Sequence, residues 1–79
     1  MDDAVRAEIE QRAQEMGLDL TPRHWEALEK VLAYYAEAEM LPTIRFLYRH
    51  FGREEAHRLF PQGMRTVAAL LNMEPPEGC

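Results

Sequence analysis

The sequence contains only one cysteine, Cys79, among its 79 residues. A single thiol excludes an internal disulfide and any zinc or redox motif that needs two cysteines. No apolar run approaches the ~20 residues that cross a bilayer. The acidic start, residues 1–6, lacks the basic and apolar regions of a signal peptide. We therefore expect a globular protein of the cytoplasm that makes no contact with a membrane.

Acidic residues outnumber basic ones, so the formal net charge is −5. This charge disfavours nonspecific binding to nucleic acid, but it is unevenly placed along the chain. Residues 1–40 contain ten acids and four bases, whereas residues 41–79 contain four acids and five arginines. The arginines and the cysteine therefore share one half of the sequence.

Proline, glycine and threonine set the boundaries of the expected helices. Thr21 can cap a helix through its hydroxyl, and Pro22 at the first helical position loses no hydrogen bond. The helix that they open must end before Pro42, which restarts a helix. Gly52 ends that helix, and Pro61 closes a short one after it.

Apolar spacings of three and four residues complete the prediction of five helices, the last over about residues 63–72. The expected apolar stripes are Val5, Ile9, Ala13 and Met16 in residues 2–15, and Trp25, Leu28, Leu32 and Tyr35 in the second helix. The aromatic residues expected in the core are Trp25, Tyr34, Tyr35, Phe46 and Phe51. No stretch alternates with period two, so the predicted fold is an all-α, small helical bundle with a helix-turn-helix unit in residues 43–72.

The composition changes after Asn72. Pro75 and Pro76 forbid helix and favour an extended chain whose backbone groups are solvated. We therefore expect a helical domain, residues 1–72, and a flexible, extended C-terminal arm, residues 73–79. At about 3.3 Å per residue this arm spans on the order of 20 Å, enough for a terminal thiol to enter another protein.

A thiol at the tip of such an arm can form a persulfide or a mixed disulfide and move between partners by sulfur exchange. An ordinary surface cysteine is the simpler alternative. Glu77 and the terminal carboxylate disfavour the thiolate of Cys79. Activation would then need positive charge at a docking site, supplied by a partner or by Arg45, Arg49 or Arg65.

Arg45, Arg49 and Arg53 are four residues apart and are expected to line one face of a helix. Such a face can simply be solvated, or it can meet phosphates or an acidic protein. The alternative function is therefore a helix-turn-helix regulatory protein that binds nucleic acid or a protein partner. Against sequence-specific DNA binding stand the acidic net charge and a last helix whose only base is Arg65.

No metal site or other cofactor is expected. His24, His50 and His57 have no carboxylate or cysteine at the spacing of a recognised metal site. The sequence also lacks a Ser/His/Asp set and convincing paired carboxylates for acid–base catalysis. If the chain has any enzymatic role, we expect Cys79 to act as a sulfur carrier without independent turnover.

Five short segments in order carry a family resemblance. They are Leu20-Thr21-Pro22-Arg23-His24-Trp25, Tyr34-Tyr35, Leu41-Pro42-Thr43-Ile44-Arg45, Arg58-Leu59-Phe60-Pro61-Gln62-Gly63 and Pro76-Glu77-Gly78-Cys79. Over residues 17–79 the chain resembles the DsrC/TusE family. This family comprises the gamma-type partner of dissimilatory sulfite reductase and the sulfur-relay protein of tRNA 2-thiouridine synthesis.

The resemblance implies a mobile C-terminal arm whose cysteine carries sulfur as a persulfide. Cys79 matches that cysteine, Gly78 and Pro76 would shape the arm, and Arg45 is the expected anchor or thiolate-stabilising charge. The expected partners are a sulfur-donor relay protein and a sulfur-acceptor enzyme. Nucleic acid would be involved only indirectly, and disulfide dimers through Cys79 are possible.

The departures from the family pattern narrow the expected function. Dissimilatory members carry a second arm cysteine upstream, where this sequence has Ala68 or Ala69. Intramolecular disulfide chemistry is thus impossible, which favours the single-cysteine, carrier-only branch. A third interpretation is a docking subunit or inhibitor of a larger sulfur enzyme that has lost sulfur transfer.

Overall fold

The computed structural model describes residues 1–76, and these residues fold into five α-helices without a strand. The helices are α1 (Asp3–Glu15), α2 (Pro22–Ala38), α3 (Ile44–Phe51), α4 (Arg53–Leu59) and α5 (Met64–Leu71). The Cα radius of gyration is 11.5 Å, as expected for a compact chain of this length. The prediction of a small all-α bundle is confirmed.

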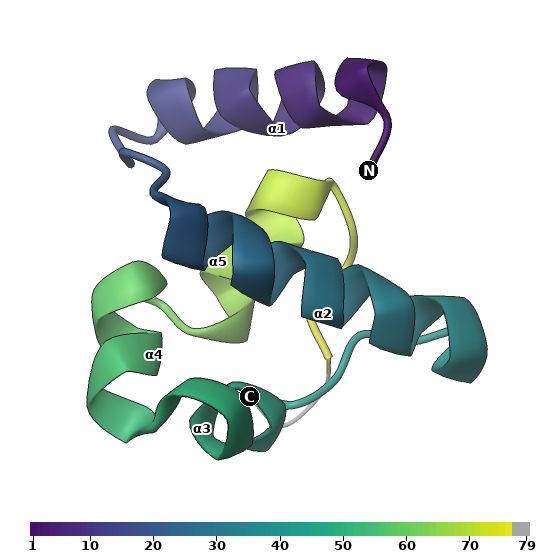
Figure 1. Ribbon diagram of the computed structural model, residues 1–79, viewed down its shortest axis with the longest axis vertical. Coiled ribbons are helices and arrows are strands. Elements are labelled where there is room, and N and C mark those ends of the chain that lie inside the picture. The colour runs from purple at the N-terminus through teal and green to yellow at the C-terminus, as the bar shows by residue number, and fades with distance from the viewer. Residues whose placement is uncertain (77–79) are drawn as a thin grey trace.

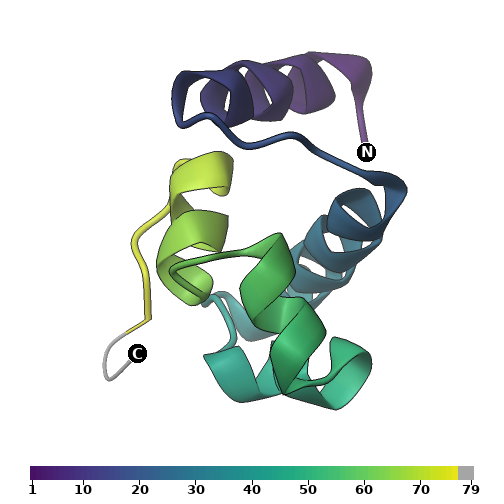
Figure 2. The same ribbon diagram turned by 90° about the vertical axis from the view of Figure 1, so that its left-hand side faces the viewer.

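Helix α5 lies at the centre of the bundle. In Figure 1, α1 lies above it, α2 crosses in front of it, and α3 and α4 lie below; Figure 2 shows the same layers from the side. Each large side chain buried here contributes about 1.5–3 kcal/mol to stability. The largest fully buried side chains come from or directly flank all five helices: Ile9, Leu28, Val31, Leu47, Phe60, Met64, Val67 and Leu70.

Helix α2 begins at the predicted capping signal. The Thr21 hydroxyl accepts a hydrogen bond from the backbone N–H of His24, and Pro22 occupies the first helical position. The Thr21 N–H in turn donates to His24 Nδ1 at 3.0 Å. The two residues therefore form a reciprocal capping box, with a histidine where glutamate or glutamine is usual.

The buried imidazole of His24 also connects α2 to the end of α4. Because Nδ1 accepts from the Thr21 N–H, Nε2 carries the proton and donates to the Leu59 carbonyl at 2.8 Å. The ring stands edge-on to Phe60, with ring centroids 5.4 Å apart. The role that the structure gives to His24 is thus to join two helices in the core.

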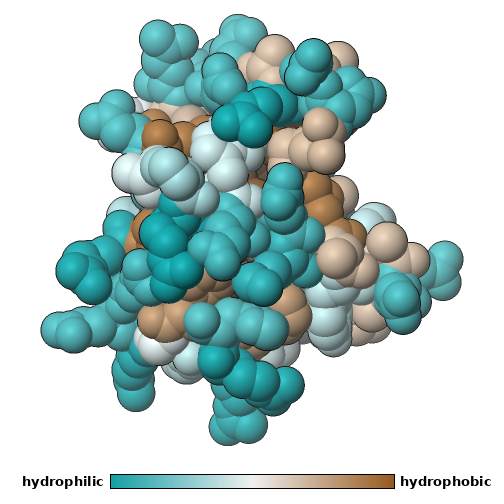
Figure 3. All heavy atoms as spheres, viewed as in Figure 1, coloured by the Kyte–Doolittle hydropathy of each residue, from teal (hydrophilic) through white to brown (hydrophobic). Residues whose placement is uncertain are grey.

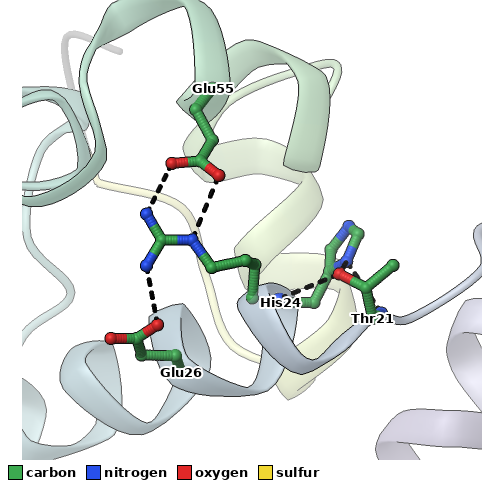
Figure 4. A network of polar contacts seen from close by, with 5 residues as sticks. Thr21, His24, Glu26 and Glu55 are labelled. Atoms are coloured by element: carbon green, nitrogen blue, oxygen red, sulfur yellow. Dashed lines mark hydrogen bonds and ion pairs between the residues drawn. The ribbon is translucent and has the colours of Figure 1, made fainter.

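An ion pair makes a second connection between α2 and α4. The Arg23 guanidinium donates to both carboxylate oxygens of Glu55, at 3.1 and 2.6 Å, and to Glu26 at 2.8 Å (Figure 4). It also lies over the Phe51 ring, 4.6 Å from the ring centroid. These hydrogen bonds favour the ionised carboxylate, so the pKa of Glu55 lies below its usual range.

Helix α3 begins slightly later than predicted. Pro42 is buried and does not start the helix; Thr43 is the extended N-cap residue, and α3 begins at Ile44. The helix ends where predicted, at Gly52, whose φ of 82° suits a residue without a side chain.

The face of α2 that enters the core differs from the prediction. Its buried residues are His24, Ala27, Leu28 and Val31. Of the predicted stripe only Leu28 is buried; Trp25 and Leu32 are partly buried, and Tyr35 is exposed. The cause is tertiary: the first half of α2 turns His24 inward, and residues 33–40 are all exposed.

Helix α1 contributes fewer core residues than its stripe predicts. Ile9 and Ala13 are buried, whereas Val5 and Met16, at the two ends of the stripe, are exposed. Between them, Arg12 donates to the Leu70 carbonyl at 3.0 Å. This bond satisfies one of the free carbonyls at the end of α5 and holds α1 against it.

Candidate functional site

The predicted arm leaves the bundle through a helix-ending motif. Asn72 adopts the left-handed conformation, with φ of 57° and ψ of 47°, and the Met73 N–H donates to the Ala68 carbonyl at 2.9 Å. This is the bond of a Schellman motif. The motif reverses the chain, so residues 73–76 run back along α5 toward α3 in both Figure 1 and Figure 2.

A groove of about 950 Å³ opens beside this segment. The end of α2, the loop that follows it and the first turns of α3 contribute to its lining, and residues 72–76 complete it. We call this surface the arm groove. The arm groove lies where segments that are distant in the sequence meet. Residues 72–76, which line it, precede the cysteine in the sequence.

Two of the four predicted site residues line the arm groove, namely Arg45 and Pro76. The fold thus brings the expected anchor next to the expected arm segment. The other two, Gly78 and Cys79, lie outside the described residues, as does the outer part of the predicted arm, residues 77–79.

Positive charge lines the α3 side of the arm groove. Arg45 and Arg49 stand one turn apart on α3 and are both exposed. Neither forms an ion pair within residues 1–76. Glu39 and Glu74 also line the groove, so it carries both signs of charge.

The third arginine of the predicted face does not belong to it. Because α3 ends at Phe51 and the chain turns at Gly52, Arg53 begins the next helix instead of continuing the same face. Its guanidinium lies over the Tyr48 ring, 5.5 Å from the centroid. The prediction of one continuous face of three arginines is therefore wrong.

Two tyrosines that were predicted in the core lie at the arm groove. Tyr34 and Tyr35 are each 38% exposed, and Tyr34 stands edge-on to Phe46 at 5.3 Å between ring centroids. Phe46 is partly buried, as is Trp25. The sequence held one signal for this exposure, because the turn after the tyrosines contains only alanines and acids.

The C-terminal end of α2 holds a backbone conformation that glycine normally provides. Glu39 has φ of 60° and ψ of 23°, and its N–H donates to the Tyr35 carbonyl at 2.8 Å. For a residue with a side chain, this conformation costs about 1 kcal/mol. The strain lies at the edge of the arm groove.

The last helix of the helix-turn-helix unit, α5, offers little surface to DNA. In α5 only Arg65 and Ala69 are exposed, so this helix has no free face to place in a groove of DNA. Elsewhere His57 forms a hydrogen bond with the Tyr48 hydroxyl at 2.6 Å, and the His50 ring stands edge-on to Phe46. In the described part of the chain no group of three possible ligands could hold a metal ion, and no helix could cross a membrane.

A sequence model of the DsrC like protein family matches residues 2–79. The chain belongs to this family. The match is longer than residues 17–79 and includes α1. The chain is also similar to proteins named sulfurtransferase TusE. It is 37% identical to that of Escherichia coli (strain K12) over 77 residues, 85% of this chain and 71% of the relative.

Further TusE relatives give the same level of similarity. The one from Yersinia pseudotuberculosis is 37% identical over 77 residues, with the same coverage as the Escherichia coli protein. The one from Salmonella choleraesuis is 37% identical over 73 residues, 80% of this chain and 67% of the relative. No solved structure matches the chain.

Proposed function

We propose that this DsrC-like protein is a sulfur carrier, which accepts sulfur as a persulfide on Cys79 and passes it to a partner enzyme. The observation that carries the proposal is a family match that extends to position 79 in a chain with one cysteine. Relatives similar over most of the chain are named sulfurtransferases. If a cysteine of this chain holds the sulfur, it can only be Cys79.

The transfer itself needs no oxidant or reductant. The Cys79 thiolate attacks the terminal sulfur of a donor persulfide, forming a new S–S bond as the bond to the donor cysteine breaks. The donor leaves as a thiolate that takes up a proton, and Cys79 becomes a persulfide. Repeating the exchange with an acceptor thiolate regenerates the Cys79 thiol, so the protein is a carrier and not an independent enzyme.

The position of the arm groove supports the roles proposed for Pro76 and Arg45. Pro76 lines this groove, and Cys79 follows it by three residues, whose extended length is about 10 Å. Gly78, next to Cys79 in the sequence, is the residue type that restricts the backbone least, which suits the proposed transfer between partners. Arg45, in the same groove, supplies a positive charge that can anchor a docked partner or favour the thiolate.

A two-step label-transfer experiment tests the carrier function. The protein is first incubated with a cysteine desulfurase, a relay protein that the desulfurase persulfidates, and cysteine labelled with sulfur-35; it is then repurified and mixed with a candidate acceptor enzyme. We expect label that dithiothreitol releases, that moves to the acceptor, and that never enters the Cys79→Ser variant. If the Cys79→Ser variant still supports tRNA thiolation in cells, the protein is instead a docking subunit without sulfur transfer.

A further inference from the structure

The end of α2 exposes large apolar side chains. Tyr34 and Tyr35 are each 38% exposed, and Met40 is 62% exposed. Figure 1 shows the last turns of α2 reaching past the other helices, and Figure 3 shows apolar surface on that projection. Exposed apolar side chains gathered in one place, with charged residues around them, are typical of interaction sites.

The composition of this surface is that of a protein interface. Tyrosine, methionine and arginine are enriched at the centres of such interfaces, and tyrosine and arginine dominate their binding energy. Here Tyr34, Tyr35 and Met40 line the same groove as Arg45 and Arg49. We call these five residues the docking face.

We propose that the docking face binds the sulfur-donor relay protein that loads Cys79. The partner surface that fits it presents an apolar side chain between carboxylates: the apolar group covers the tyrosines and Met40, and the carboxylates pair with Arg45 and Arg49. This inference rests on the proposed carrier function and identifies where the donor docks.

The position of the docking face suits this role. Residues 72–76 line the same groove, so a protein bound here lies beside the base of the segment that leads to Cys79. With a partner docked here, the thiol has to reach no farther than the extended length of three residues, about 10 Å. Such proximity raises the effective concentration of the two reacting sulfurs.

The neighbouring charges favour a protein over a nucleic acid. Glu39 and Glu74 line the same groove, and the whole chain carries −5, so a polyphosphate would be repelled around the two arginines. A protein can place its carboxylates against Arg45 and Arg49 alone. The flexible side chain of Met40 also lets this face adapt to the shape of a partner surface.

The test compares two variants of equal charge. Arg45→Glu/Arg49→Glu changes the docking face, and Arg53→Glu/Arg65→Glu changes exposed arginines elsewhere; each exchange subtracts two charges, so both variants carry −9 instead of −5. Binding to the relay protein used above is measured by fluorescence anisotropy with each variant in a Cys79→Ser background. We expect Arg45→Glu/Arg49→Glu to weaken binding about tenfold or more and the control to stay within about twofold of the parent.

A second measurement separates docking from chemistry at the thiol. Cys79 is alkylated with iodoacetamide, a small neutral reagent that needs no docking. For each variant the rate of loading is divided by the rate of alkylation, which cancels any effect of Arg45 on the thiolate. We expect this ratio to fall about tenfold in Arg45→Glu/Arg49→Glu and to stay within about twofold of the parent in Arg53→Glu/Arg65→Glu. Met40→Ala, a change at a mostly exposed position, should also weaken binding without unfolding the chain.

Several results would overturn the docking face. Equal binding by both double variants would show that Arg45 and Arg49 do not contribute to binding of the relay protein. An equal slowing of alkylation and of loading in Arg45→Glu/Arg49→Glu would assign these arginines to the chain's own thiol, and salt-sensitive tRNA binding lost only in that variant would assign them to nucleic acid. If the parent binds the relay protein through the docking face but never gains sulfur from it, the carrier function fails and the docking face stands.

Discussion

Replacing His24 by alanine tests the polar contact at the centre of the fold. The side chain is 5% exposed, accepts a hydrogen bond from the Thr21 N–H and donates one to the Leu59 carbonyl. Each lost bond costs about 1 kcal/mol, and a buried carbonyl left without a donor adds about 1–3 kcal/mol. With the lost packing against Phe60, we expect His24→Ala to reduce the free energy of unfolding by about 3 kcal/mol or more.

Urea unfolding followed by circular dichroism measures this loss. For a chain of this size, about 3 kcal/mol lowers the unfolding midpoint by about 1–3 M urea. His57→Ala is the matched control, since it removes an exposed histidine with one hydrogen bond, to Tyr48, and should cost no more than about 0.5–1 kcal/mol. His24→Gln keeps one acceptor and one donor and should fall between the two. A His24→Ala protein within about 1 kcal/mol of wild type would refute the role given to this side chain.

Three further changes test local features of the fold. Gly63→Ala should lower the free energy of unfolding by about 2 kcal/mol, because φ is +61° and the new Cβ would lie 3.1 Å from Ile44 Cδ1; an unchanged melting temperature would contradict this. Glu39→Gly should raise stability by about 1 kcal/mol, since it relieves the left-handed backbone at the end of α2, and a loss in the same melting assay would oppose the argument. Because Arg23 lowers the pKa of Glu55, wild type should exceed Glu55→Gln in stability at neutral pH, and this difference should shrink as the pH falls below the usual glutamate pKa of about 4.3; a difference that does not vary with pH would refute the assignment.

Helix boundaries were the part of the fold most open to prediction from sequence. Thr21 with Pro22 begins α2, and Gly52 ends α3, because capping and left-handed turns depend on the residues at those positions. The restart at Pro42 was placed two residues early, since the choice between Pro42 and Thr43 depends on how the loop packs. Local chemistry thus determined where most helices lie.

The faces of the helices and the groove could not be predicted in the same way. The burial of His24 in place of Trp25 depends on the Leu59 carbonyl, a contact across 35 positions of the sequence. Tyr35 continues an apolar stripe and yet is exposed, because α2 extends beyond the helices that it packs against. The arm groove forms because residues 72–76 run back toward α3, and no pattern in the local sequence predicts this course of the chain.

The candidate site was partly accessible from the sequence. The single cysteine and the two prolines before it predict the arm, and the spacing of Arg45 and Arg49 predicts that both lie on one face. Spacing alone also included Arg53, which the turn at Gly52 removes from that face. A spacing of four residues predicts a shared face only within one continuous helix.

Intact-mass spectrometry of the reduced protein tests the carrier function most directly. Wild type and Cys79→Ser are incubated with a cysteine desulfurase, cysteine and a relay protein. The mass of each protein is then measured before and after treatment with dithiothreitol. The account predicts that wild type gains the mass of one sulfur atom, that dithiothreitol removes it, and that Cys79→Ser gains nothing. No gain by wild type from any donor, or an equal gain by the Cys79→Ser variant, would contradict it.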